Sequence, residues 1–160
     1  MEELIRNYIE HLKEAMNKSD DLTEIRKEEE FPISPYLQSI QDELENIVKL
    51  LSSKNTSTEE RKSNAYKLLV HLHNAQSSAS LLESFLLFAQ SSSVWNKIRG
   101  KIQNAVNWVR NHLIPWLQNL WSSVWGIIQT LITPKEWKLS GELGTGVLGF
   151  AKASIEITFG

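Results

Sequence analysis

The chain has 160 residues, no cysteine and a formal net charge of −2 at pH 7. Its length suits one domain, and its hydrophobic content of 41% with 22% charged residues excludes wholesale disorder and a multi-span membrane protein. The lack of cysteine excludes disulfide scaffolds, thiol nucleophiles and thiolate metal sites.

Residues 2–17 are predicted to form a first amphipathic helix, because apolar side chains recur there at helical spacing. The acidic start of this helix does not have the basic and apolar runs of a secretory signal, which predicts a cytoplasmic protein. Residues 18–33 follow as a charged connector in which acids outnumber bases, and Pro32 and Pro35 oppose continuation of a helix.

A second helix is predicted over residues 34–51, with Ser34 as its N-cap and Pro35 at the first helical position. A third runs from a capping box, either Thr56 with Glu59 or Ser57 with Glu60, to about residue 90. The serines within residues 74–80 compete for backbone hydrogen bonds and predict a bend or an interruption in that helix.

Residues 94–133 form the fourth predicted segment, with apolar residues at steps of three and four. Pro115 cannot donate an amide hydrogen bond to the carbonyl of Asn111, so we expect a kink or a break into 94–112 and 115–132. Pro134 ends the segment.

Charge is polarised along the chain. Residues 1–90 hold 10 Lys and Arg against 16 Asp and Glu, a balance of −6, whereas residues 91–160 hold 7 against 3, a balance of +4. No acid lies between Glu83 and Glu136, and five of the six tryptophans do. The residues predicted to contact a membrane or a partner are Trp95, Lys97, Arg99, Lys101, Trp108, Arg110, Trp116, Trp121 and Trp125.

Residues 111–134 carry no formal charge when His112 is neutral, but six polar side chains make a lone membrane-spanning helix too costly. An interfacial helix on anionic lipid suits the tryptophans and the cations. The alternative is a soluble bundle with the tryptophans in its core. The acidic first 90 residues could cover the basic helix in a resting soluble state, so the two interpretations need not exclude each other. Nucleic acid is not expected as a partner, because phosphate repels those acids.

Trp116, Trp121 and Trp125 cannot share one stripe of a straight helix, since Trp121 lies about 140° and Trp125 about 180° round the axis from Trp116. A core face centred on Leu117 and Leu120 leaves Trp125 as the predicted contact outside the core.

Residues 135–160 change to a period of two and predict a C-terminal β-hairpin with a glycine-rich turn. A two-stranded hairpin is marginal alone, so we expect it to pair with another copy or to pack on the helices. The residues predicted to mediate assembly are Trp137, Leu139, Leu143, Ile155, Ile157 and Phe159.

Motifs for chemistry are weak. Residues 144–149 match G-x-G-x-x-G, but strand-like sequence follows in place of the helix that a dinucleotide site needs. The four histidines do not form a ligand pattern, and there is no G-x-S-x-G. We therefore predict that the protein is not an enzyme and uses no metal or cofactor.

The segment Gly141-Glu142-Leu143-Gly144-Thr145-Gly146, followed by residues 151–159, resembles the strand-rich ends of small trypsin-co-occurring domains. This resemblance covers about 24 residues and implies a bacterial conflict or defence setting, beside a protease or a signalling NTPase.

The sequence thus predicts a mainly α fold: a four-segment helical bundle over residues 1–134 with a kinked, Trp-rich last helix, then the hairpin over 135–160. The predicted function is self-assembly, together with binding of the basic, Trp-rich last helix to the inner face of an anionic membrane. The alternative is a soluble adaptor that binds a protein partner through the same helix and hairpin.

Overall fold

The computed structural model describes residues 2–28, 31–54 and 57–131, and this part of the chain is mainly helical. Its elements are α1 (Glu2–Lys18), α2 (Asp20–Arg26), α3 (Ser34–Leu51), α4 (Thr58–Ser91), the 3₁₀ helix η1 (Ser93–Ile98), α5 (Arg99–Trp108), the π-helical turn η2 (Val109–Leu113) and α6 (Ile114–Leu131). The hairpin predicted for residues 135–160 lies outside the described residues.

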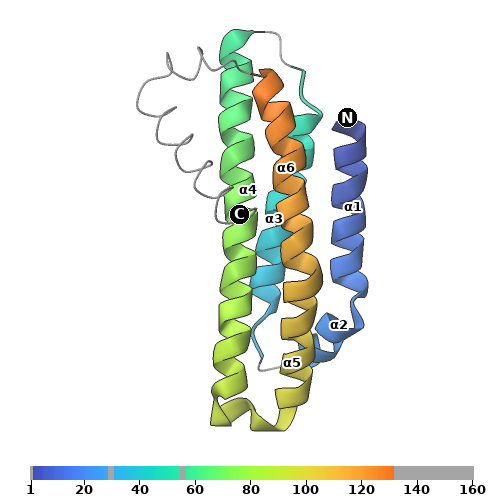
Figure 1. Cartoon of the computed structure of the whole chain (residues 1–160), viewed down its shortest axis with the longest axis vertical. Coiled ribbons are helices and arrows are strands. Elements are labelled where there is room, and N and C mark those ends of the chain that lie inside the picture. Colours follow the sequence, from blue (N-terminus) through green and yellow to red (C-terminus); the bar gives the residue numbers. More distant parts are fainter. Residues whose placement is uncertain (1, 29–30, 55–56, 132–160) are drawn as a thin grey trace.

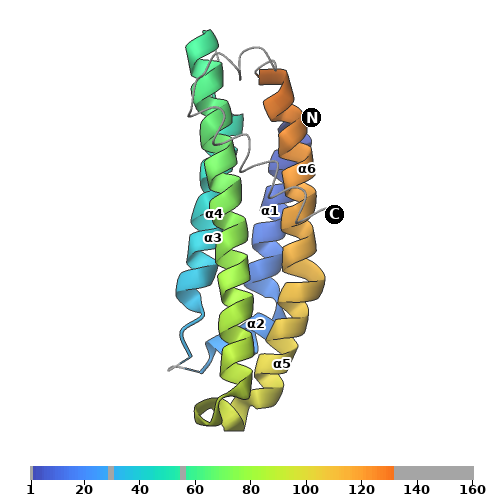
Figure 2. The same ribbon diagram turned by 60° about the vertical axis from the view of Figure 1, so that its left-hand side comes forward.

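The long helices form a four-helix bundle, with α5, η2 and α6 together making its fourth rod (Figure 1). Consecutive rods run in opposite directions: α1 descends in the view of Figure 1, α3 ascends, α4 descends, and the fourth rod ascends. Each rod packs against two neighbours, so α1 and α4 lie diagonally opposite (Figure 2). The short helix α2 closes the lower end of the bundle against α5.

The core follows a heptad pattern. Its buried positions alternate in steps of three and four, which keeps one seam of each helix facing its neighbours in a left-handed bundle. On α4 these positions are Ala65, Leu68, Leu72, Ala75, Ala79, Leu82, Leu86 and Ala89, and Leu69 is buried beside them. On α1 they are Ile5, Ile9, Leu12 and Met16. The alanines of α4 leave room for the close approach of its neighbours.

The starts of α3 and α4 differ in how well the sequence predicted them. The Ser57 side chain accepts a hydrogen bond from the backbone amide of Glu60 at 3.2 Å, which confirms the cap predicted at Ser57. The predicted cap at Ser34 is wrong: Ser34 is the first residue of α3, and Ile33 occupies the N-cap position with no side-chain cap bond. Because Ile33 is fully buried, its packing into the core fixes where the helix starts.

The predicted connector contains a helix that the sequence analysis missed. Ser19 caps α2 by accepting a hydrogen bond from the Leu22 amide at 3.2 Å, and Leu22 and Ile25 are fully buried. The charged residues of the segment lie on the other faces of this short helix, so the segment both links α1 to α3 and adds to the core.

The expected interruption of the third helix is wrong, because α4 is continuous over 34 residues. The serines near its middle bond to other side chains: Ser78 shares a hydrogen bond of 2.8 Å with Ser39 of α3, and Ser77 lies 3.2 Å from the ring nitrogen of His73. Side-chain partners therefore satisfy these hydroxyls without a bend in the helix.

Pro115 distorts the last rod without breaking it. Just before the proline, the Ile114 amide bonds to the Val109 carbonyl, five residues back, and residues 109–113 form a π turn. This wider turn accommodates the missing amide of Pro115, a common cause of such distortions. The predicted break into two helices is replaced by one rod that continues to Leu131.

Candidate functional site

The tryptophans of η1 and of the last rod are buried or partly buried. Trp108 is buried and Trp121 is 0% exposed, while Trp95, Trp116 and Trp125 are partly buried and pack against the core. Trp95 sits edge-on to Phe31, with ring centres 5.0 Å apart. In the described part of the chain, the exposed large hydrophobic residues are instead Leu4, Tyr66, Leu81, Phe88 and Val94.

Two of the four cations predicted to contact a membrane form ion pairs with carboxylates of the same chain. Lys101 lies 2.8 Å from Glu28, and Arg110 lies 3.1 Å from Glu83, so acids from the first 90 residues reach the basic segment. The hydrogen bond to Glu28 raises the pKa of Lys101. Lys97 and Arg99 are exposed.

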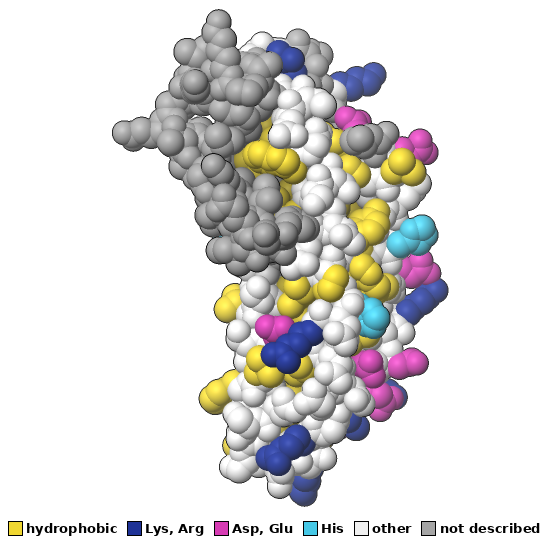
Figure 3. Space-filling model, viewed as in Figure 1, with side chains coloured by type: hydrophobic (Ala, Val, Ile, Leu, Met, Phe, Trp, Pro, Cys, Tyr) yellow, Lys and Arg dark blue, Asp and Glu magenta, His cyan; other side chains and the backbone are white. Residues whose placement is uncertain are grey.

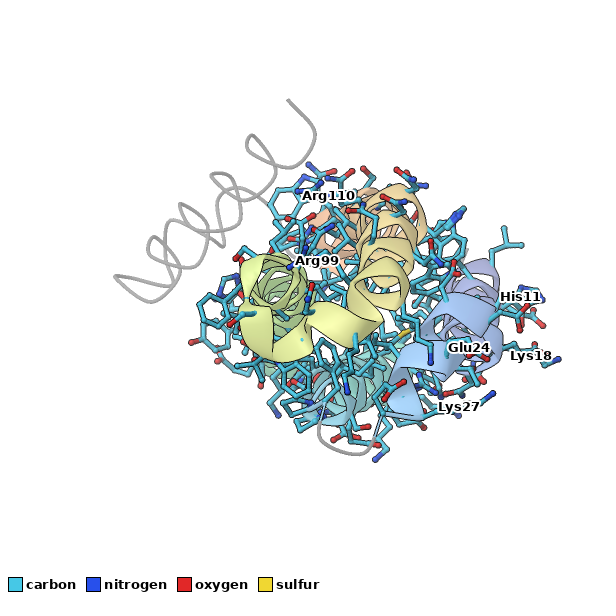
Figure 4. All side chains as sticks on the ribbon, turned by 90° about the horizontal axis from the view of Figure 1, so that it is seen from below. His11, Lys18, Glu24, Lys27, Arg99 and Arg110 are labelled. Atoms are coloured by element: carbon cyan, nitrogen blue, oxygen red, sulfur yellow. The ribbon has the colours of Figure 1, made fainter. Side chains whose placement is uncertain are left out.

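Figure 4, which looks at the lower end of the bundle, shows how these cations are distributed. Arg99 and Arg110 lie apart from the labelled side chains of α1 and α2, which are His11, Lys18, Glu24 and Lys27. Trp108 and Trp121 are buried, so the predicted contact residues do not all lie on one exposed surface.

Between α1 and α6 the surface of the protein is hollowed, and we call this feature the α1–α6 groove. It holds two adjoining cavities. One, of about 310 Å³, is lined by Tyr8, His11, Leu12, Ala15 and Trp116. The other, of about 350 Å³, is lined by Leu4, Ile5, Tyr8, Ser122, Ser123 and Gly126. Tyr8 lines both, so the cavities form one groove along the two helices.

Tyr8 and Trp116 fix the geometry of the groove. The Tyr8 hydroxyl donates a hydrogen bond of 2.9 Å to the Trp116 carbonyl, which ties α1 to α6, and burial raises the pKa of Tyr8. The Trp116 ring stands nearly perpendicular to that of Trp108, with centres 5.7 Å apart, and lies 5.4 Å from the ring of His112. Trp116, which lines the groove, is thus held in place by the Tyr8 hydrogen bond and by its ring contacts with Trp108 and His112.

The outer face of α6 borders this groove and carries no charge. Helix α6 contains no Asp, Glu, Lys or Arg, and its exposed residues are Asn119, Ser122, Ser123, Gln129 and Thr130. The hydroxyls of Ser123 and Thr130 donate to carbonyls of their own helix at 3.1 and 2.6 Å. Figure 3 shows mainly white and yellow atoms over α6, with charged side chains along the α1 side and over the lower part of the molecule.

The sequence predicted the α6 side of the α1–α6 groove but not its α1 side. The uncharged run from residue 111 was noted, but Leu4, Tyr8 and His11 were assigned only to the first helix or to isolated histidines. The signal was present: Leu4, Tyr8, His11 and Ala15 recur at helical spacing beside the buried stripe, which predicts a second, outward apolar edge.

Other predicted features carry no site. The assembly residues Trp137, Leu139, Leu143, Ile155, Ile157 and Phe159 lie outside the described residues. Within residues 2–28, 31–54 and 57–131, no group of three His, Asp or Glu side chains is placed to hold a metal. None of the helices in these ranges is long and apolar enough to span a membrane.

Comparisons with known proteins give no relative: no family model, no curated protein and no solved structure matches the chain. The resemblance of residues 141–159 to trypsin-co-occurring domains therefore stays a prediction.

Proposed function

We propose that this protein is a non-enzymatic helical interaction module that binds protein through the α1–α6 groove and the outer face of α6. The observation that carries the proposal is a surface helix of 18 residues without one charged side chain, beside two open cavities. Protein interfaces are depleted of charge at their centre, and ligand clefts are lined mainly by apolar groups. Assembly through residues 137–159, in a bacterial defence setting, stays part of the proposal.

The burial of the tryptophans favours this function over a membrane-bound last helix. Trp108 and Trp121 are buried in the bundle, and Lys101 and Arg110 have carboxylate partners, so binding lipid along this helix requires the bundle to open. Opening exposes a core of this size to water and costs free energy that the α1–α6 groove does not require.

A photo-cross-linking residue at Ser123 tests the proposal in cells that produce the protein. We expect discrete protein adducts at Ser123 and none at Asn104, an exposed residue of α5 that serves as the control. Gly126→Leu, which places apolar bulk where a Cβ would meet nothing within 4 Å, is expected to suppress the adducts while the chain stays folded. Equal labelling at both positions, unaffected by Gly126→Leu, contradicts the proposal.

A second candidate function is contact with anionic membrane at the turn between α4 and α5. There Val94 is 77% and Phe88 69% exposed, close in sequence to the exposed cations Lys97 and Arg99. Apolar side chains beside cations suit the interface of an anionic bilayer.

Flotation with anionic vesicles separates this candidate from the first. Under the membrane function, the protein floats at low salt, less so at moderate salt, and the double change Lys97→Ser with Arg99→Ser removes the binding. No flotation at low salt rules this candidate out.

A further inference from the structure

We propose that the partner seated on the outer face of α6 is a second copy of this chain, with the two α6 helices packed antiparallel about a twofold axis at Ser122. This inference rests on the proposed function and names its partner. It would make the protein a symmetric dimer, the commonest closed assembly of soluble proteins.

Charge singles out α6 among the surface helices. In a twofold interface each residue near the axis meets its own copy, so a charged residue meets a like charge, which costs several kcal/mol. Helix α1 carries exposed Glu3, Glu10 and Glu14, and α5 carries Arg99 and Lys101. Because α6 has no charged residue, it meets itself without repulsion along its whole length.

Five of the six outward positions of α6 are symmetric about Ser122, and the sixth, Asn119, would face Trp125 of the other copy. At 100° per residue, the side of the helix opposite the core holds Pro115, Gln118, Asn119, Ser122, Gly126 and Gln129. In an antiparallel pair centred on Ser122, Pro115 faces Gln129 of the other copy, and Gln118 faces Gly126. The helix Ile114–Leu131 has its midpoint at the same place, so the pairing uses nearly all of it.

The middle of this face allows a close approach. Ser122, Ser123 and Gly126 are small, and a Cβ at Gly126 would meet nothing within 4 Å, so the single chain leaves that space open. The Ser123 hydroxyl is already bonded to the Asn119 carbonyl of its own helix, so covering Ser123 leaves that hydroxyl satisfied. Helices pack at 8–10 Å, the shorter distances needing small residues at the contact.

Apolar groups flank this centre. Leu4 of α1 is 71% exposed and lines the same cavity as Ser122 and Gly126. Trp125, one residue before Gly126, is only partly buried. A second α6 laid over the face would cover both side chains, giving the dimer an apolar contribution beyond the uncharged polar centre.

Opposite charges at the axis give the decisive test, read by sedimentation velocity and light scattering of the full chain. We expect a concentration-dependent dimer for the unchanged protein. Ser122→Glu and Ser122→Lys alone should each raise the dissociation constant more than about tenfold, and an equal mixture of the two should restore a dimer. The control Asn104→Glu, on the exposed side of α5, should leave the dimer unchanged. Circular dichroism melts check that each variant is folded.

The cysteine-free chain allows a second readout. Ser122→Cys should form a covalent dimer on mild oxidation, whereas Asn104→Cys should not. The inference is overturned if the unchanged protein is monomeric at about 100 times the protein concentration used in the oxidation assay. It is also overturned if neither charge variant changes the dissociation constant and Ser122→Cys forms no covalent dimer. If Ser123 then still cross-links to a different protein, the proposed function stands and only the second copy is wrong; if it does not, both fail.

Discussion

At the scale of single residues, two tryptophans of α6 show why helical angle alone does not set burial. Trp116 and Trp121 lie about 70° to either side of the core direction defined by Leu117 and Leu120. Trp121 is fully buried, whereas Trp116 is partly buried and lines a cavity beside α1. Trp125, about 110° from the core direction, is also partly buried. The difference comes from the neighbouring helix, which the sequence of α6 does not contain.

Replacement of Trp121 and of Trp125 by alanine should have different effects. We expect Trp121→Ala to lower the free energy of unfolding by about 3–5 kcal/mol, the range for a truncated core aromatic. The Trp121 indole nitrogen is buried without a hydrogen-bond partner, which offsets part of what its packing contributes and favours the lower end. Trp125→Ala should weaken self-association while leaving the fold largely intact. Urea unfolding and sedimentation measure both; equal losses of stability with unchanged association would make Trp125 an ordinary core residue.

His73 should make stability depend on pH in the weakly acidic range. Partial burial lowers the pKa of His73 below its usual 6.5. The unfolded chain therefore binds more protons than the folded one, so this contribution is present above about pH 6.5 and is lost as the pH falls toward the lowered value. We expect the decline in stability between about pH 7.5 and 5.5 to be shallower in His73→Gln than in the unchanged protein, by urea unfolding at each pH. Parallel curves would exclude His73 as the cause.

At the scale of elements, the three serines at helix starts explain where prediction succeeded. Ser57 caps α4, as one of the two predicted capping boxes has it, and Ser57 and the described residues that follow it, Thr58 to Glu60, are exposed. At α3, burial of Ile33 decides the start and Ser34 is left inside the helix. Ser19, followed by two acids and then Leu22 and Ile25, had a helix-start pattern that the dense charge of the segment obscured. Local capping rules hold where tertiary packing does not override them.

Loss of the cap at Ser57 should destabilise the protein modestly. Ser57→Ala removes the acceptor for the Glu60 amide, and we expect about 1 kcal/mol less stability in urea unfolding. Ser63→Ala, an exposed change inside the same helix, is the matched control and should be neutral or slightly stabilising, since alanine has the higher helix propensity. A loss at Ser63 equal to that at Ser57 would argue that the cap contributes nothing specific.

The buried faces of the helices were the most predictable feature, because periodic apolar residues depend on the chain's local pattern alone. The pairing of those faces was not. Glu28 and Lys101 are 73 positions apart, and Tyr8 and Trp116 are 108 apart, so their contacts depend on how four rods are arranged around one axis. The α1–α6 groove could not be predicted for the same reason. The sequence shows the apolar edge of α1 and the uncharged α6, but it does not show that these two helices are neighbours.

At the scale of the whole molecule, acids of the first 90 residues form ion pairs with cations of the basic second part of the chain. The acidic first part supplies Glu28 and Glu83 to Lys101 and Arg110, as expected of a bundle in which acids cover the basic helix. These pairs are partly exposed, so each contributes little to stability by itself. Each pair places a carboxylate beside a cation of the last rod, while Lys97 in η1 and Arg99 at the start of α5 are exposed.

Removal of residues 135–160 should separate two kinds of assembly. The buried core of the described bundle runs from Ile5 to Ile128, so a chain ending at Pro134 retains all the helices that the structure describes and is expected to stay folded. If residues 137–159 join copies through their strands, the shortened chain loses assemblies larger than a dimer, while the contact at Ser122 on α6 remains. Light scattering and thermal melts of the two chains measure this. A shortened chain that matches full length in both would show that residues 135–160 neither assemble the protein nor stabilise it, and would leave the contact at Ser122 on α6 to account for any dimer.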